Sequence, residues 1–286
     1  MGASLPMKLA LTKPYSRIRL FGYFLLPYPF QPTSLASYFS AKSTQFLLLV
    51  FLLTVLQPLQ AAKGSVFAFT KIADTNTAIP GGGGNFTQWG AFSLNGCKMA
   101  FGASGLNREG VYLYDNGSPA TIVDTSSLIP EGTGNFMHFG HVSYDNGNLA
   151  MKGGGENQSG IYLHTEGSLQ RVVDLNTPIP EGMGNFTHID EPSFDMGAVA
   201  FSGADTDSQL GIHTANSGTI TKVADTNTAS PDGLGDFTSI SACSSLYDAG
   251  HVAFEGRGVD QDGGYANSGG EIIGVADQKH HHAWKC

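Results

Sequence analysis

The chain has 286 residues, of which 41% are hydrophobic, only 14% are charged and 38 are glycine. That length allows one large β domain or two ordinary domains, and low charge with abundant glycine is typical of a turn-dense β protein rather than a helical enzyme. All 24 acidic residues lie after residue 73 together with eight bases, so this part carries a net charge of −16. Such a charge argues against nucleic acid and anionic lipid as partners, and it leaves cations, neutral glycans and other proteins.

Residues 1–62 have the composition of a targeting region. The first 73 residues contain seven bases and no acid, and Phe46–Leu56 is an apolar core of 11 residues. This core is shorter than the about 20 residues that a membrane-spanning helix needs. The sequence therefore predicts a signal peptide cleaved near Ala61 or Ala62.

The segment upstream of the apolar core is long for a signal peptide and holds a second apolar patch, Leu20–Phe30. It is interpreted either as the product of a start codon placed too far upstream or as part of a two-part address for an organelle lumen. A third alternative is an uncleaved N-terminal segment that anchors the protein in a membrane. We expect a secreted or cell-surface protein that contacts a membrane only through this segment, if the segment is retained.

Four tandem units of about fifty residues follow the targeting region. The acid that ends each V-x-D run recurs at steps of 50, 50, 51 and 52, and the aromatic residue after the next loop keeps the same register. These two sets of landmarks are Asp74, Asp124, Asp174, Asp225 and Asp277, and Phe86, Phe136, Phe186 and Phe237. They predict a repeat domain over 63–277, with a leading strand 66–74, units 75–124, 125–174, 175–225 and 226–277, and a tail 278–286.

Each unit is predicted to consist of four short strands, as the third unit illustrates. Alternating or short apolar runs bounded by turn residues predict strands over 185–194, 198–203, 210–215 and 219–225. Four strands in about fifty residues match one blade of a kelch-length β-propeller. The fold class is therefore all-β and β-propeller-like, with an open β-solenoid as the alternative.

A blade cannot bury both of its faces alone, so the units must stack. The leading strand resembles the fourth strand of a unit, and it can pair into the last blade to close a ring. The last unit already has its own fourth strand at Glu271–Asp277, which leaves the closure of the ring open.

The repeats resemble a family of exported bacterial proteins, the choice-of-anchor tandem-repeat proteins, whose repeat reads N-x-x-G-x-x-A-F. The matching segments are "YDNGNLAM" at Tyr144–Met151, "FDMGAVAF" at Phe194–Phe201 and "YDAGHVAF" at Tyr247–Phe254, and the resemblance covers residues 66–277. In this chain the leading asparagine of the repeat is replaced in every unit, and Cys97 takes the glycine position in the first. The resemblance implies export and a surface or secreted role, and it implies no catalytic residues.

The acids and amides at the strand ends are candidate metal ligands. In a propeller these connections lie on one face, where they can form a ring of the oxygen ligands that Ca²⁺ prefers. The alternative is local, because Asp and Asn at a strand end hydrogen-bond the backbone two residues on and start a turn. The candidate ligands for Ca²⁺, the one cofactor considered, are Asp74, Asn76, Asp124, Asp174, Asn176, Asp225 and Asn227.

The glycine-rich loops "PGGGGNF", "PEGTGNF", "PEGMGNF" and "PDGLGDF" invite comparison with phosphate loops. A phosphate loop needs a helix N-terminus after its glycines, whereas a strand follows here, and Glu131, Glu181 and Asp232 would repel phosphate. The loops are therefore predicted to be turns between blades, in which proline fixes φ and glycine supplies a positive φ.

Three smaller patterns bear on an enzymatic alternative. The turns Ser143–Gly147 and Ser193–Gly197 read S-x-D-x-G, similar to the Asp-box of sialidase-like propellers, but the arginine cluster that a sugar carboxylate requires is missing. His138 and His188 occupy equivalent positions and are a candidate two-histidine metal site. The unit-specific acids Asp190 and Glu191 are the remaining candidates for catalysis.

We expect an exported, non-catalytic surface or matrix repeat protein that binds an extracellular glycan or protein through its loop face. No catalytic residue is predicted. The alternatives are a propeller-fold enzyme acting on carbohydrate, sialidase-like or lyase-like, and a purely structural surface repeat.

Overall fold

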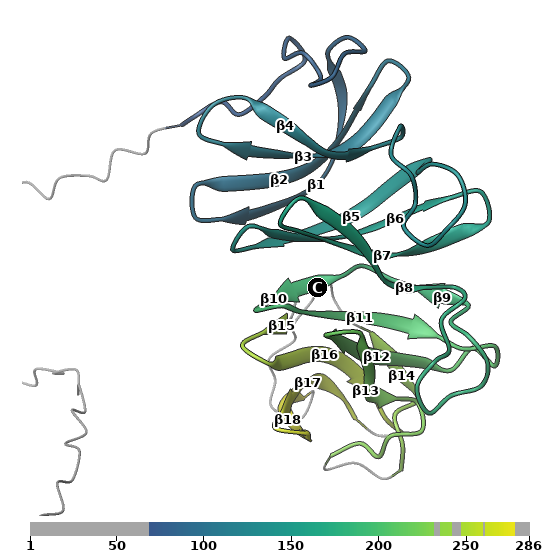
Figure 1. Cartoon of the computed structure of the whole chain (residues 1–286). Coiled ribbons are helices and arrows are strands. Elements are labelled where there is room, and N and C mark those ends of the chain that lie inside the picture. Colours follow the sequence, from purple (N-terminus) through teal and green to yellow (C-terminus); the bar gives the residue numbers. More distant parts are fainter. Residues whose placement is uncertain (1–68, 232–234, 242–246, 260, 278–286) are drawn as a thin grey trace, which may run out of the picture. The chain divides into compact units, whose positions relative to one another are not determined.

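The computed structural model describes residues 69–231, 235–241, 247–259 and 261–277. The predicted targeting region 1–62 and the tail 278–286 lie outside these residues. The part described forms strands β1 to β18 and no helix, so the all-β prediction is confirmed. Figure 1 shows these strands as successive antiparallel sheets that follow the order of the predicted units.

The first two sheets each have four antiparallel strands that neighbour one another in chain order. The first sheet consists of β1 (Phe86–Asn95), β2 (Lys98–Gly105), β3 (Arg108–Asp115) and β4 (Pro119–Asp124). The second consists of β5 (His138–Asp145), β6 (Asn148–Gly155), β7 (Gln158–Thr165) and β8 (Ser168–Asp174).

The third and fourth sheets follow the same order, but two short strands take the place of the first strand. The third sheet consists of β9 (His188–Ile189), β10 (Ser193–Asp195), β11 (Ala198–Ala204), β12 (Leu210–Asn216) and β13 (Thr219–Asp225). The fourth consists of β14 (Ser239–Ser241), β15 (Tyr247–Asp248), β16 (His251–Arg257), β17 (Asp262–Ser268) and β18 (Glu271–Asp277).

The predicted first strand over 185–194 is therefore interrupted, whereas the second to fourth strands of that unit are confirmed to within a residue. Pro192 lies in the gap between β9 and β10, and proline has no N–H to donate to a sheet. The four blade-like sheets confirm the β-propeller-like fold class.

A repeated aromatic pair forms the core of each sheet. The phenylalanine that follows the glycine-rich loop is buried and meets the ring of a third-strand residue edge-on, with ring centroids 4.9 to 5.0 Å apart. The pairs are Phe86–Tyr112, Phe136–Tyr162, Phe186–His213 and Phe237–Tyr265. Edge-to-face geometry is a preferred arrangement of two rings, so these pairs explain why the loop aromatic recurs in register.

Successive sheets pack face to face through three apolar clusters. We call the face that a sheet turns toward the next sheet its front face, and the opposite one its rear face. In the first cluster Val111 and Val123 on the front face of the first sheet pack with Phe136, Val142 and Tyr144 on the rear face of the second. No such cluster joins the fourth sheet to the first within the residues described.

The leading strand was predicted over 66–74, of which the structure describes 69–74, and these residues form no strand. Ile72 and Ala73 instead pack on the rear face of the first sheet, against the cluster that contains Phe86 and Tyr112. The last sheet has β18 in its fourth position, so a leading strand is not needed to complete it.

Candidate functional site

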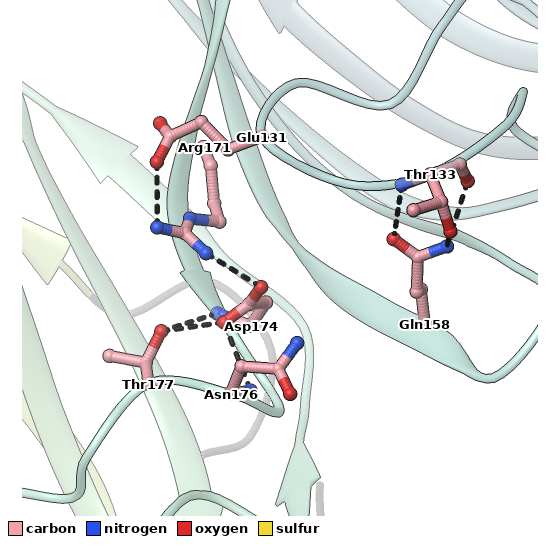
Figure 2. A network of polar contacts seen from close by, with 7 residues as sticks. All are labelled: Glu131, Thr133, Gln158, Arg171, Asp174, Asn176 and Thr177. Atoms are coloured by element: carbon pink, nitrogen blue, oxygen red, sulfur yellow. Dashed lines mark hydrogen bonds and ion pairs between the residues drawn. The ribbon is translucent and has the colours of Figure 1, made fainter.

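Each strand-end aspartate is part of a closed local turn. The Asp174 carboxylate accepts hydrogen bonds from the Asn176 N–H at 3.0 Å and the Thr177 hydroxyl at 2.8 Å, and its own N–H donates to Thr177 Oγ1 at 3.0 Å (Figure 2). The same turn closes at Asp74, Asp124 and Asp225. The local alternative from the sequence, an Asp-initiated turn, is therefore confirmed.

A basic residue holds the second oxygen of each of these carboxylates. The pairs are Asp74 with Lys71 at 3.0 Å, Asp124 with Arg108 at 3.1 Å, Asp174 with Arg171 at 2.9 Å and Asp225 with Lys222 at 3.0 Å. Burial by itself would raise the pKa of Asp174, but the hydrogen bond from Thr177 and the Arg171 guanidinium outweigh it and hold that pKa below its ordinary value. The four aspartates are thus already paired with bases.

The seven predicted calcium ligands all lie in these turns, but the structure does not bring them together as one coordination sphere. No group of three or more His, Cys, Asp or Glu residues in the described ranges is placed to hold a metal ion. Asn76, Asn176 and Asn227 contribute their backbone N–H groups to the turns. Calcium binding by this set stays a prediction, and it competes with the ion pairs that the aspartates make.

The glycine-rich loops fold back on themselves as the sequence predicted. In the second unit the Ile129 N–H donates to the Gly134 carbonyl at 3.0 Å, and a bridge joins Leu128 to Asn135. Glu131 and Glu181 take positive φ values of 56° and 57°, at the place where the first loop has Gly81 at 84°. Among the described residues, each of these closed loops is followed by a strand and not by a helix, so the loops are turns between sheets.

The acids of these loops have a role that the sequence analysis missed. Arg171 lies between Glu131 at 2.7 Å and Asp174, so one guanidinium connects the loop to the last strand of its own sheet (Figure 2). Lys222 does the same for Glu181 at 2.8 Å. The sequence indicates this ion pair, because the acid and the base occur together in the second and third units. The first unit lacks both and has Gly81 and Thr121 at the equivalent positions.

A groove of about 1060 Å³ lies between the first two sheets, on the face that carries the glycine-rich loops. The β2–β3 turn of the first sheet and the β6–β7 turn of the second form its sides, and residues 133–137 of the loop between them also line it. Its polar lining includes Asn107, Thr125, Asn135, Glu156, Asn157 and Gln158.

Several groove residues are already engaged in holding the structure. Arg108 pairs with Asp124, and Glu109 accepts a hydrogen bond from the Phe139 N–H at 2.8 Å. The Gln158 side chain accepts a hydrogen bond from the Thr133 N–H and donates to the Thr133 carbonyl and hydroxyl oxygens (Figure 2).

The amides at the tips of the two turns are not engaged. Asn107 and Asn157 are exposed at equivalent positions with φ of 58° and 56°, and their side chains make no hydrogen bond to the described part of the chain. The groove therefore presents amide groups that both donate and accept hydrogen bonds.

The Asp-box-like turns join neighbouring sheets. Ser143 Oγ accepts the Phe194 N–H of the next sheet at 2.9 Å, and Ser193 Oγ accepts the Tyr247 N–H at 3.1 Å. The Asp195 carboxylate likewise accepts the Ala249 N–H at 2.7 Å. The serine and aspartate of this pattern thus serve the stacking of the blades.

Asp190 connects a histidine and a serine in an order that differs from the order of a serine triad. Asp190 lies between His188 at 2.8 Å and the Ser202 hydroxyl at 3.1 Å. In a serine triad the histidine itself contacts the hydroxyl that it deprotonates, whereas here the carboxylate separates the two. Glu191 faces His141 at 3.9 Å.

The fold and the groove together define an all-β protein of propeller-like blades with a polar loop-face groove. The chain belongs to the family described as "Family of unknown function (DUF7453)", whose pattern matches residues 61–278. No curated protein matches the chain. The resemblance to choice-of-anchor proteins stays a prediction, and among the described residues no helix is long and apolar enough to cross a membrane.

Two solved structures are similar to the chain at low identity. One is a chain of a nidogen/laminin complex, at 12% identity and a TM-score of 0.34, covering 63% of this chain and 60% of that chain. The other is a protein assigned as TolB of Agrobacterium tumefaciens, at 14% identity and a TM-score of 0.40, covering 70% of this chain and 68% of that chain. This chain thus spans less than two thirds of the length of the first of them.

Proposed function

We propose that this protein is an exported, non-catalytic surface or matrix module that binds a neutral glycan in the groove between its first two sheets. The observation that carries the proposal is the pair of unengaged amides, Asn107 and Asn157, on the two sides of that groove. Amides form the paired donor and acceptor contacts that sugar hydroxyls offer.

The charge of the groove supports a neutral rather than an anionic ligand. Arg108 is neutralised by Asp124, while Glu109 and Glu156 also line the groove. Carboxylates without a free base repel anionic sugars. Export is supported by the apolar core Phe46–Leu56 and the bases that precede it.

The test is a glycan array probed with the chain from Lys63 onward, which contains the compact unit Phe69–Cys286. The variant carries Asn107→Gly and Asn157→Gly, since glycine keeps the positive φ while removing the amide. Asn116→Gly, at φ 52° in the β3–β4 turn, is the matched control. We expect neutral glycans to bind, the double variant to lose at least tenfold in affinity, and the control to bind as the native chain does.

A silent array would overturn glycan binding and favour a purely structural repeat, whereas turnover of an arrayed glycan would favour the carbohydrate-active enzyme. Localisation is tested separately, by sequencing the N-terminus of the protein secreted from its host. A start just after Ala61 or Ala62 supports export. A retained N-terminal segment favours the membrane-anchored alternative, and recovery from an organelle favours the two-part address.

A further inference from the structure

The first sheet leaves part of its rear face open. Phe92 and Leu94 on β1 are 54% and 68% exposed. Their counterparts in the second sheet, Val142 and Tyr144, are 1% and 6% exposed because the front face of the first sheet covers them. The repeat thus presents at this end a surface of the kind that is buried at every internal junction.

The fourth sheet leaves its front face open in the same way. Gly264 on β17 holds the position at which earlier sheets bury Val111, Ile161 and Ile212, and a Cβ added to it meets no atom within 4 Å. On the neighbouring β18, Val275 is 67% exposed. A terminal repeat normally carries a polar outer face. In the described residues the first sheet instead exposes Phe92 and Leu94, whereas the fourth sheet carries the ion pairs of Arg257 with Glu255 and Asp262 beside Gly264.

The side chains at the two open faces differ from those at the internal junctions. The rear face of the first sheet has Phe92 and Leu94 where the second sheet has Val142 and Tyr144, and the front face of the fourth sheet has glycine where the others have valine or isoleucine. The small residue at Gly264 leaves room for a large side chain of a facing sheet.

We propose that the protein associates head to tail, with the front face of the fourth sheet of one copy packed on the rear face of the first sheet of a second copy. The contact continues the geometry of the three internal junctions, in which a front face of small aliphatic side chains receives aromatic and branched ones. Because the two faces differ, the interface is heterologous, and it generates rings or filaments rather than a face-to-face dimer.

The segment 69–74 covers part of this face. Ile72 and Ala73 are equivalent in the repeat to Ile122 and Val123 on the last strand of the first sheet, and they pack against the cluster that contains Phe86 and Tyr112. The β18 of an incoming copy would therefore have to displace them.

The test measures molar mass by light scattering for the chain from Lys63 to Cys286, over a wide range of concentrations. Leu94→Lys blocks the rear face, and Gly264→Lys blocks the front face beside its cross-strand partner Glu255. Both positions are open to solvent in a single copy, so each variant is expected to fold. Leu128→Lys, at an equally exposed leucine of a glycine-rich loop, is the control.

We expect the native chain and the control to associate as concentration rises, and each blocking variant to remain monomeric. Mixing the two variants should restore a dimer and nothing larger, because each supplies the one face that the other lacks. A native chain that stays monomeric at every concentration, as it would if its own sheets closed a ring, overturns the proposal. A mixture that stays monomeric overturns it as well, since it indicates a symmetric interface.

Discussion

At the scale of single residues, the third-strand ring position shows what the repeat tolerates. Three units place tyrosine there, and the third unit places His213, which is 1% exposed and whose Nδ1 has no hydrogen-bond partner. A cavity of about 10 Å³ lies beside this ring, lined in part by Asp225 and Lys222. Burial lowers the pKa of His213 to about 4 from an ordinary value of 6.5.

His213 makes the stability of the fold depend on pH. Between pH 6.5 and about 4, His213 is protonated in the unfolded chain and neutral in the folded chain. The free energy of unfolding therefore falls by roughly 3 kcal/mol as the pH drops through this window. Urea unfolding at pH values across the window measures the fall. His213→Tyr should remove this part of the slope and stabilise the protein by about 1 kcal/mol at neutral pH, because tyrosine fills the cavity.

The exposed His188→Tyr is the matched control and should leave the slope unchanged. The strand-end aspartates do not confuse the measurement. The pKa values of Asp174 and Asp225 are lowered from 3.8, so the stability that they contribute is lost only as the pH falls below that value. Burial also lowers the pKa of His164, which adds a slope of its own. A slope as steep in His213→Tyr as in the native chain would contradict the assignment.

The two acids that share Arg171 differ in their contribution to stability. Asp174 is buried and accepts hydrogen bonds from Asn176 and Thr177, whereas Glu131 is largely exposed. We expect Asp174→Ala to lower the free energy of unfolding by about 2 kcal/mol, since it leaves partly buried donors and the Arg171 guanidinium unpaired. Glu131→Ala should change it by less than about 1 kcal/mol, as for most exposed ion pairs. Equal effects in thermal unfolding would contradict this ranking.

At the scale of elements, a serine hydroxyl joins the first strand of each sheet to its neighbour in the next sheet. Ser93, Ser143 and Ser193 accept the N–H of Tyr144, Phe194 and Tyr247 respectively, at 2.8, 2.9 and 3.1 Å. These bonds satisfy backbone donors that face another sheet rather than a strand of their own.

Ser143→Ala should therefore lower the free energy of unfolding by about 1 to 2 kcal/mol, because the Phe194 N–H loses its acceptor. Hydrogen exchange at that amide should accelerate more than at amides within β11 or β12. Ser168→Ala, at an exposed serine of β8, provides the comparison and should have no effect on either measurement. An unchanged exchange rate at Phe194 would show that the hydroxyl does not hold the junction.

Much of the element structure was predictable because it depends on local patterns. The turn at Asp195–Gly197 and the strands that follow it coincide with the sequence prediction, since alternation and turn residues act over a few positions. Pro192 indicates a break in the first strand of the third unit, but the prediction followed the alternation of the residues around it. The break before β10 was therefore not predicted. Residues 69–74 were predicted as strand because they resemble a fourth strand, but the fourth position of the last sheet is filled by β18.

The site was less predictable, because its contacts join distant residues. Ser143 and Phe194 are 51 positions apart, and Glu131 and Arg171 are 40 apart. The aspartates were identified as candidate ligands from their spacing alone. Three of their basic partners, Lys71, Arg171 and Lys222, lie only three residues earlier in the sequence, whereas Arg108 becomes evident as the partner of Asp124 only in the structure. The groove arises from two turns of different sheets, and no single segment of sequence contains it.

At the scale of the whole molecule, the predicted calcium ring has a direct test. Each strand-end carboxylate already has a cation within 3.1 Å, so a calcium ion would have to displace four bases. We expect the melting temperature of the chain from Lys63 onward to be the same with Ca²⁺ and with EDTA. A rise with Ca²⁺ that Asp174→Ala reduces would restore the calcium prediction, because ligand binding to the folded state raises its stability.

The stacking of the sheets through successive junctions also has a mechanical consequence. A protein held at a surface and pulled from its ends would load the junctions in series, because each sheet contacts chiefly the sheet before and the sheet after it. Sheets would then detach one at a time, and each would release roughly 170 Å of extended chain. The molecule would thus lengthen in steps under load and dissipate work at every step, as an extensible tether does.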